Sequence, residues 1–297
     1  MEVKALRASM DPEGKFNSPL AQGRVDEAYD NLKIRLLHYP KIEDFVKTAS
    51  FGEAAHAGGA LDPIAELDSL GPNELTSKVK QFMHGGLEQF LESDTVVYLV
   101  YGCTRGYTHE IVRTRNGAWF FQQTSRHSYL GDANLRMPEY IANSTEEVKE
   151  LWVRTTREAI NSYINMCENH DVPYQDARTV IPVGMQTWIV VGMPLRTYLN
   201  MNSYRTCAMF YPEMVWIQRK VGDLVKEACP WLSDKIKIGC ESSKVCEYRG
   251  VEETHDSCDK PWAHIRRWKS DHYAAEGKDV LLKDHNKKGC KICKKQQ

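Results

Sequence analysis

A run of arginines, aromatic side chains and amides has the composition of a nucleotide pocket. Residues 108–126 read THEIVRTRNGAWFFQQTSR, in which Arg113 and Arg115 precede an aromatic segment that ends in five polar residues: Gln122, Gln123, Thr124, Ser125 and Arg126. Guanidinium groups bind phosphate oxygens through paired hydrogen bonds, whereas amides and hydroxyls bind the edge of a heterocycle. A solvated helix end followed by a core strand would show the same order of polar and aromatic residues, so that structural arrangement is the alternative.

A second group of polar side chains lies in an otherwise apolar part of the chain. It comprises Arg178, Arg196, Asn200 and Arg205. Arg196 and Asn200 are four residues apart and therefore share one helix face, and Arg205 lies further along it. An arginine that points inward from a helix is costly unless it meets an anion. That anion is either a ligand or a structural partner such as Glu213 or Glu227.

The composition narrows the possible classes of protein. The 39 Lys and Arg residues nearly balance the 40 Asp and Glu residues, for a net charge of −1. The chain therefore lacks the strong positive field of a general nucleic-acid binder, and any anionic partner is met locally. No apolar run is long enough to span a bilayer, and the N-terminal sequence lacks the apolar segment of a secretory signal. We predict a cytoplasmic protein without membrane association.

The cysteines fall into two groups. Four lie in apolar or helical patterns, which favours reduced thiols packed as small hydrophobic groups: Cys103, Cys167, Cys207 and Cys229. In the Lys-rich tail, Cys290 and Cys293 have the spacing of a metal-ligand pair, but no second pair of this kind accompanies them. The tail is thus either a zinc site or a mobile basic extension. Its IRRWK segment either touches nucleic acid or is a solvated helix end.

Hydrophobic periodicity predicts the elements that position the polar residues. Strand patterns occupy residues 94–104 and 187–193, and residues 25–38 form an amphipathic segment. Helical patterns occupy residues 73–91, 195–205 and 213–228, with Asn73 as the cap of the first and Pro230 ending the last.

A further long helix is predicted to end before Pro173. Ser144 and Glu147 form a capping-box pattern at its start. Its predicted packing face consists of Val148, Leu151, Trp152, Thr155, Ala159, Tyr163 and Cys167.

Taken in order, these residues resemble the motifs of the flavin-dependent thymidylate synthases, which methylate deoxyuridylate with FAD instead of a cysteine nucleophile. The family's Arg-His-Arg and Ser-x-Arg motifs match residues 113–115 and 124–126. Its Ala-Arg-x-x-Leu-Pro motif matches residues 177–182, and its Arg-Ser-Leu-x-Asn-Phe-Leu-x-Leu-Arg segment matches residues 196–205. Glu213 lies where the family has a glutamate shortly afterwards. The resemblance extends over residues 71–233.

The match departs from the family pattern at several positions. Thr114 replaces the central His, Thr124 replaces the Ser, and Met209 lies where the family has a His. Ser93 likewise replaces the His of an upstream Leu-Glu-His motif. A hydroxyl at residue 124 can still donate to a phosphate. Because of these departures, the motifs do not decide which pyrimidine nucleotide is the substrate or how the protein adjusts the redox properties of the flavin.

The resemblance implies an α/β (α+β) fold, with a central β-sheet and packed helices, assembled as a homotetramer with active sites at subunit interfaces. It implies that FAD is bound by Arg113, Thr114, Arg115, Arg196 and Asn200. The nucleotide would be bound by Gln122, Gln123, Thr124, Ser125, Arg126 and Arg178, the last two at its phosphate. The implied catalytic residues are Arg205, at the pyrimidine carbonyl, and Glu110, between the two ligands.

The implied domain organisation has three parts. Residues 1–70 form an N-terminal extension of the core, residues 71–240 the flavin- and nucleotide-binding catalytic core, and residues 241–297 the polar tail.

The implied reaction transfers a one-carbon unit from methylenetetrahydrofolate to deoxyuridylate. Reduced flavin supplies hydride and NADPH reduces the flavin again. Two alternatives remain open. One is a related flavoenzyme that methylates or hydroxymethylates another pyrimidine nucleotide, and the other is a non-catalytic nucleotide or nucleic-acid binding module.

Overall fold

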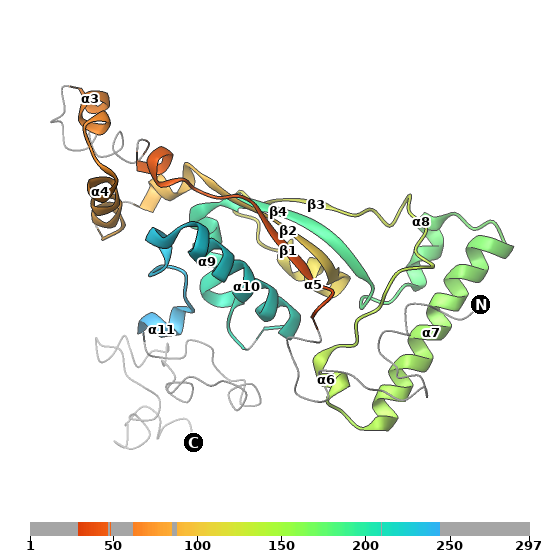
Figure 1. The fold of residues 1–297 in the computed structure, drawn as a ribbon. Coiled ribbons are helices and arrows are strands. Elements are labelled where there is room, and N and C mark those ends of the chain that lie inside the picture. Colours follow the sequence, from red (N-terminus) through yellow and green to blue (C-terminus); the bar gives the residue numbers. More distant parts are fainter. Residues whose placement is uncertain (1–28, 47, 49–61, 85–87, 209, 244–297) are drawn as a thin grey trace, which may run out of the picture.

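The computed structural model describes residues 29–46, 48, 62–84, 88–208 and 210–243 (Figure 1). In this part of the chain, helices pack against a four-stranded antiparallel sheet with the strand order β1-β2-β4-β3. The strands are β1 (Lys33–His38), β2 (Thr95–Thr104), β3 (Trp119–Gln122) and β4 (Gln186–Pro194). This arrangement confirms the predicted α+β class with a central sheet.

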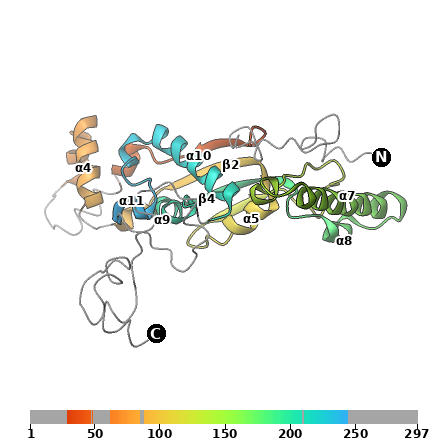
Figure 2. The ribbon, with the colours of Figure 1, turned by 90° about the horizontal axis from the view of Figure 1, so that it is seen from below.

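The helices cover one face of the sheet and extend beyond its ends. The α-helices are α3 (Pro63–Asp68), α4 (Pro72–His84), α5 (Arg105–Ile111), α6 (Glu139–Ala142), α7 (Glu146–Asn169), α8 (Tyr174–Ala177), α9 (Leu195–Arg205), α10 (Pro212–Ala228) and α11 (Gly239–Ser243). The described ranges also contain the short 3-10 helices η3 (Glu88–Glu92), η4 (Arg178–Val180) and η5 (Pro230–Leu232). Helices α9 and α10 pack against each other and the sheet, whereas α4 and α7 lie toward its opposite ends (Figures 1 and 2).

The two faces of the sheet differ in how well they are covered. On the buried face, Tyr98 of β2 pairs with Val191 of β4, and both side chains are fully buried. Side chains alternate between faces along a strand. At its β1 edge the opposite face carries the exposed Lys33 and Arg35, which pair with Tyr101 and Leu99. The apolar side chains of this face are therefore Val97, Leu99 and Tyr101 of β2, Trp188 and Val190 of β4, and Trp119 and Phe121 of β3. We call these seven residues the open sheet face.

Several predicted elements are confirmed and others are wrong in detail. Strands β2 and β4 and helices α9 and α10 occupy the predicted positions. The amphipathic segment at residues 25–38 contains the edge strand β1 in its described part, where Ile34 pairs with Val100. The helix predicted over residues 73–91 divides into α4 and η3, and Asn73 lies inside α4 because that helix begins at Pro72.

The predicted capping box of α7 is wrong, and its predicted packing face is right only in part, since Tyr163 is buried and Trp152 and Cys167 pack against the core. The helix begins at Glu146, and its N-cap is Thr145, which makes no side-chain cap hydrogen bond. Val148 and Leu151 are 39% and 52% exposed, while Lys149, Val153 and Thr156 are buried. Because α7 packs against α6, α8 and η4 rather than the sheet, the apolar periodicity identifies its packed side only in part.

Among the described residues, no helix has both the length and the apolar character needed to cross a membrane. The predicted domain boundaries at residues 70 and 240 stay predictions.

Candidate active site

Helix α5 positions the polar groups at the end of the central strand β2. A β-bulge precedes it, where Gly102 has φ +82° and a Cβ would lie 2.7 Å from the carbonyl oxygen of Asn31. Thr104 then caps the helix, because its hydroxyl accepts a hydrogen bond from the backbone N–H of Tyr107. Arg105 and His109 are four residues apart on one side of α5, and Glu110 lies on another side.

A cavity of about 150 Å³ lies beside α5. Its polar lining consists of Arg105, His109, Ser125 and Arg178, and its apolar lining of Leu130, Ile181, Pro182, Val183 and Met185. An Nη1 of Arg178 donates a hydrogen bond of 2.9 Å to Oγ of Ser125. Two of the predicted nucleotide-binding residues therefore meet at a concave site.

Arg105 adds a second positive charge to this cavity. Burial, followed by the nearby charge of Arg178, lowers the pKa of the Arg105 guanidinium. In the part of the chain that the structure describes, neither arginine pairs with a carboxylate. Two adjacent guanidiniums without a counter-charge favour an anionic ligand. Arg105 and His109 are not among the site residues predicted from the sequence, although a cation and an imidazole four residues apart directly after the strand pattern 94–104 were a usable signal.

The predicted nucleotide-binding segment is fixed to α5 and β4 by its own hydrogen bonds. Nε2 of Gln122 donates to the Thr108 hydroxyl at 2.8 Å, and Nη2 of Arg105 donates to the carbonyl oxygen of Gln123 at 2.9 Å. The Thr187 hydroxyl donates to the side chain of Gln123 at 3.3 Å. These bonds hold the segment beside the cavity, but Gln122, Gln123 and Thr124 do not line it as Ser125 does.

The end of this segment is held more loosely at the surface. The backbone N–H of Arg126 donates to Oγ1 of Thr124, and its Nε donates to Gln175 at 3.1 Å. Arg126 is exposed and does not line the cavity.

Glu110 and Arg205, the two predicted catalytic residues, form an ion pair. Nη1 of Arg205 lies 2.9 Å from Oε2 of Glu110, and Nη2 donates to the Glu110 carbonyl oxygen at 3.4 Å. The Arg205 guanidinium carbon lies 4.8 Å from the centre of the Phe210 ring and 5.5 Å from that of Tyr204. Nε of Arg205 is buried without a hydrogen-bond partner in the described structure. The guanidinium is therefore oriented and neutralised by the protein.

The predicted FAD-binding residues come from two neighbouring segments. Arg113 and Arg115 are exposed, whereas Thr114 is buried and its hydroxyl has no hydrogen-bond partner among the described residues. The loop that follows is tied to α9, because the Thr197 hydroxyl donates to the Asn116 carbonyl oxygen at 2.6 Å. The turn in this loop needs Gly117, which has φ +72° and lies against Pro194.

The α9 members of this group lie at the surface. Asn200 is exposed, and Arg196 pairs with Glu92 at 2.7 Å. An exposed pair of this kind contributes little to stability, so Arg196 can exchange Glu92 for a ligand phosphate. The proposed structural partners of the α9 arginines, Glu213 and Glu227, are wrong, because Arg196 pairs with Glu92 and Arg205 with Glu110.

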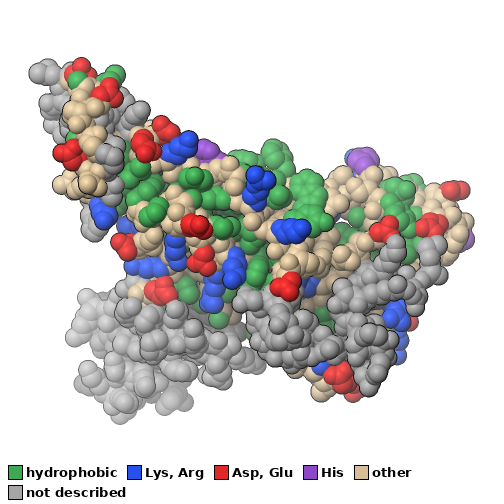
Figure 3. All heavy atoms as spheres, in the orientation of Figure 1, with side chains coloured by type: hydrophobic (Ala, Val, Ile, Leu, Met, Phe, Trp, Pro, Cys, Tyr) green, Lys and Arg blue, Asp and Glu red, His purple; other side chains and the backbone are tan. Residues whose placement is uncertain are grey.

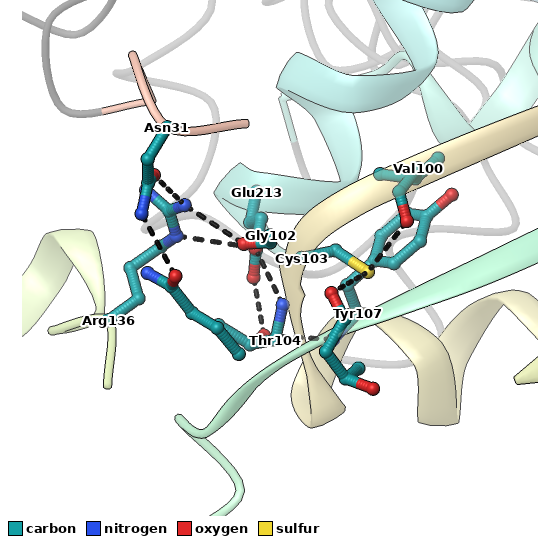
Figure 4. Close-up of polar contacts among 10 residues, drawn as sticks. Asn31, Val100, Gly102, Cys103, Thr104, Tyr107, Arg136 and Glu213 are labelled. Atoms are coloured by element: carbon teal, nitrogen blue, oxygen red, sulfur yellow. Dashed lines mark hydrogen bonds and ion pairs between the residues drawn. The ribbon is translucent and has the colours of Figure 1, made fainter. Parts of the chain in front are cut away.

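Glu213 instead belongs to a buried polar cluster that fixes the corner between β2 and α5 (Figure 4). Its carboxylate accepts hydrogen bonds from the backbone N–H and the hydroxyl of Thr104, and lies 3.5 Å from Nε of Arg136. Nη2 of Arg136 donates to Asn31 at 2.7 Å and to the carbonyl oxygen of Gly102 at 3.1 Å. Burial raises the pKa of Glu213, and the charge of Arg136 opposes that rise.

Arg136 is not among the residues predicted from the sequence. Its flanking residues, Leu135 and Met137, are buried, so a charged residue between two apolar ones was the available signal. The cluster has a structural role, because it joins residues far apart in the chain at the base of α5.

No group of three His, Cys, Asp or Glu side chains in the described ranges could hold a metal ion. Cys290 and Cys293 lie outside the described residues, so the zinc hypothesis stays a prediction. Of the four cysteines predicted to pack as reduced hydrophobic groups, Cys103, Cys207 and Cys229 are buried and Cys167 is half-buried, all as free thiols.

Comparisons with known proteins point to one family. The profile of the family described as "Thymidylate synthase complementing protein" matches residues 46–231. A flavin-dependent thymidylate synthase from Pyrococcus furiosus is 29% identical over 143 residues, which are 47% of this chain and 58% of that protein. One from Geobacter sulfurreducens is 26% identical over 211 residues, which are 70% of this chain and 88% of that protein.

A solved structure shares the fold. It is the crystal structure of a UMP/dUMP methylase, PolB, from Streptomyces cacaoi bound with 5-Br dUMP. The TM-score is 0.55 and the sequence identity 15%, and the match covers 69% of this chain and 93% of that one. Because the family profile spans more than half of the sequence, the chain belongs to the thymidylate synthase complementing protein family, as a divergent flavin-dependent thymidylate synthase homologue.

Proposed function

We propose that this protein is an FAD-dependent enzyme that methylates deoxyuridylate to thymidylate. The observation that carries the proposal is the division of the arginines into two kinds. Arg105 and Arg178 line a cavity without carboxylate partners, whereas Arg205 is neutralised by Glu110. A pyrimidine nucleoside monophosphate needs an arginine of each kind. Its phosphate is anionic and binds an arginine without a carboxylate partner, whereas its pyrimidine carbonyls are neutral in the ground state.

The unpaired arginines are suited to the phosphate. Arg178, held by Ser125, and Arg105, held by Gln123, present their remaining N–H groups to the cavity. Arg126 and Thr124 are the neighbours of Ser125 in the sequence. We therefore expect the Arg126 guanidinium and the Thr124 hydroxyl to contact the same phosphate. Gln122 and Gln123 would then contact the sugar or the base edge.

The neutralised arginine is suited to the reacting pyrimidine. Electron density must move onto the ring carbon that is methylated, and negative charge develops on a carbonyl oxygen as it does so. An oriented guanidinium stabilises that charge, while Glu110 prevents it from binding a second phosphate instead. The role of Glu110 in this proposal is to orient Arg205.

The residues predicted to bind FAD are compatible with that cofactor. Arg113 and Arg115 are exposed and carry no ion pair to another described residue, so both guanidiniums can bind the pyrophosphate. The buried hydroxyl of Thr114, which lacks a described partner, can contact the isoalloxazine edge. When bound and reduced, the flavin supplies hydride. We include methylenetetrahydrofolate as the carbon donor and NADPH as the reductant on the strength of family membership.

The second candidate substrate has ribose in place of the deoxyribose of dUMP. The solved neighbour is titled a UMP/dUMP methylase, and Thr114 and Thr124 depart from the family motifs. UMP methylation is therefore the second candidate function. It uses the same phosphate and carbonyl sites.

The expected result for purified full-length protein is a yellow solution with a flavin absorption spectrum. The double variant Arg113→Ala, Arg115→Ala is expected to be colourless, because both phosphate-binding forks are removed. The matched control is Arg154→Ala on the exposed side of α7, which should leave the flavin stoichiometry unchanged. Absorption of the released flavin measures the occupancy.

Product analysis then separates the candidate substrates. The protein is incubated with methylenetetrahydrofolate, NADPH and either dUMP or UMP, and the nucleotide is identified by mass spectrometry. Thymidylate formed from dUMP supports the proposal, and methylated UMP alone favours the second candidate. A colourless protein that methylates neither nucleotide would leave only the non-catalytic binding module.

We also propose that the chain assembles as a homotetramer. The open sheet face supports this, because it is apolar and lies uncovered at the surface, with Tyr101 52% and Phe121 65% exposed. Hydrophobic side chains gather along the sheet in the space-filling view (Figure 3). A second copy packed on this face would bury it and bring the adjacent β3 segment to a subunit interface.

Phe121→Asp is expected to shift the protein from tetramer to smaller species, because a carboxylate would be buried in the interface. Light scattering coupled to size exclusion measures the mass. Phe121 lies on an edge strand and is exposed, so the single subunit should still fold. Ile64→Asp, at an exposed site on α3, is the control. A parent protein that is already monomeric would contradict the proposed assembly.

A further inference from the structure

A second cavity, of about 280 Å³, lies between α9, α10 and the segment that leads into α11. Asn202 and Thr206 of α9 line one side, and Arg219, Gly222 and Lys226 of α10 line another. Lys237 closes the rim. None of the residues assigned to the FAD or nucleotide site lines this cavity.

The described lining of the cavity carries three cations, Arg219, Lys226 and Lys237, and two carboxylates, Asp223 and Glu241, so its net charge is positive. Lys226 pairs with Asp223 at 3.7 Å, and the Glu241 carboxylate accepts from the backbone N–H of Ile238 at 3.3 Å. Arg219 and Lys237 pair with no carboxylate among the described residues. The rim therefore retains an attraction for an anion.

Arg219 is already oriented by the fold. Its Nε donates to the carbonyl oxygen of Thr206 at 3.1 Å, at the C-terminal end of α9. This bond leaves the two terminal nitrogens of the guanidinium without a partner in the described structure. A planar fork fixed at one nitrogen is suited to bind a phosphate through the others.

The inner end of the cavity holds polar atoms that the protein does not satisfy. Asn202 is 2% exposed, and its Oδ1 has no hydrogen-bond partner among the described residues. It faces Gly222, where a Cβ would lie 3.5 Å from Oδ1 and 3.9 Å from the Tyr198 hydroxyl, which also lacks a described partner. A buried acceptor without a donor destabilises the fold unless a ligand or water supplies one.

We propose that this cavity binds a small phosphate monoester that carries hydroxyl groups at its other end. Arg219 and Lys237 bind the phosphate, and a hydroxyl donates to Oδ1 of Asn202. The volume suits a molecule of the size of a pentose phosphate, since pockets for larger drug-sized ligands begin at about 300 Å³. The site is separate from the proposed active site and does not depend on the proposed reaction.

The test uses ribose 5-phosphate with the full-length protein, and calorimetry measures its affinity. The cavity beside α5 also attracts phosphates, so the measurements are made in an Arg178→Ala background. In that background, Lys237→Glu is expected to weaken binding about tenfold to a hundredfold, the effect of losing a charged hydrogen bond. The Lys237 side chain makes no hydrogen bond or ion pair to another described residue, and only its backbone N–H donates, to the carbonyl oxygen of Lys235, so this change should not disturb folding.

Lys220→Glu is the matched control, because it makes the same charge change on α10 outside the cavity. It should alter the affinity less than twofold. Gly222→Ala should also weaken binding without changing any charge, since its methyl group would occupy the space beside Asn202.

Three outcomes would overturn the proposal. One is complete loss of ribose 5-phosphate binding in the Arg178→Ala protein, which would leave only the cavity beside α5. Another is an equal effect of Lys237→Glu and Lys220→Glu, which would show general electrostatic attraction. The third is that inorganic phosphate binds as tightly as ribose 5-phosphate, which would show that no sugar hydroxyl gains affinity from Asn202.

Discussion

Arg205→Ala is expected to lower kcat about a hundredfold to a thousandfold, and FAD should remain bound. A loss of this size is usual when one hydrogen-bond donor to the oxyanion of the transition state is removed. Arg205 is oriented by Glu110 and flanked by Phe210, so the protein positions its guanidinium before the substrate arrives. Turnover of dUMP by the flavin-loaded protein measures the effect. The flavin absorption of the same sample shows that the cofactor site is intact.

Variants of Glu110 separate orientation from proton transfer. Glu110→Gln keeps an acceptor for the Arg205 N–H and should retain most of the activity, whereas Glu110→Ala should lose much of it. Loss of activity in both variants would instead make Glu110 a proton donor or acceptor. An Arg205→Ala protein that turns over dUMP at the parent rate would remove Arg205 from the proposed mechanism.

Glu213→Ala is expected to lower the free energy of unfolding by about 3–5 kcal/mol, the usual result of removing one partner from a buried ion pair. The change leaves Arg136 buried without its carboxylate and removes the acceptor for two donors of Thr104. Urea denaturation followed by circular dichroism measures the loss. Because Thr104 caps α5, the variant should also loosen the helix that carries Arg105 and Glu110.

Glu227→Ala is the control, since Glu227 is exposed on the same helix and its removal should change the unfolding free energy by less than about 0.5 kcal/mol. Glu213→Gln should be intermediate, because the amide keeps an acceptor for Thr104 but loses the charge opposite Arg136. A Glu213→Ala protein as stable as the parent would mean that the cluster in Figure 4 adds nothing to the fold.

The elements with strong local periodicity are predictable from the sequence. Helix α9 occupies the predicted residues 195–205, and β2 and β4 coincide with the two apolar runs. In each case the information lies within one turn or one strand, where residue type and spacing decide the conformation. The ordered motifs also identify the family, because their residues occupy fixed positions along the chain.

Where the local sequence pattern is weak, the predicted type or orientation of an element is wrong in detail. Residues 33–38 read as an amphipathic segment, and only pairing with β2 makes them an edge strand. The apolar residues of α7 are spaced as on a helix, but the side that packs is set by α6, α8 and η4. A helical period shows that one face is apolar without showing what lies against it.

The sequence by itself determined the family, the central strands, the main helices and the residues able to bind an anion. Only the tertiary structure decided which charges meet. Arg205 pairs with Glu110, 95 residues away, and Glu213 with Arg136, whereas Arg105 and Arg178 come together without a carboxylate. Such pairings leave no local pattern, because ion pairs depend on distance in space and burial rather than on neighbours in the chain.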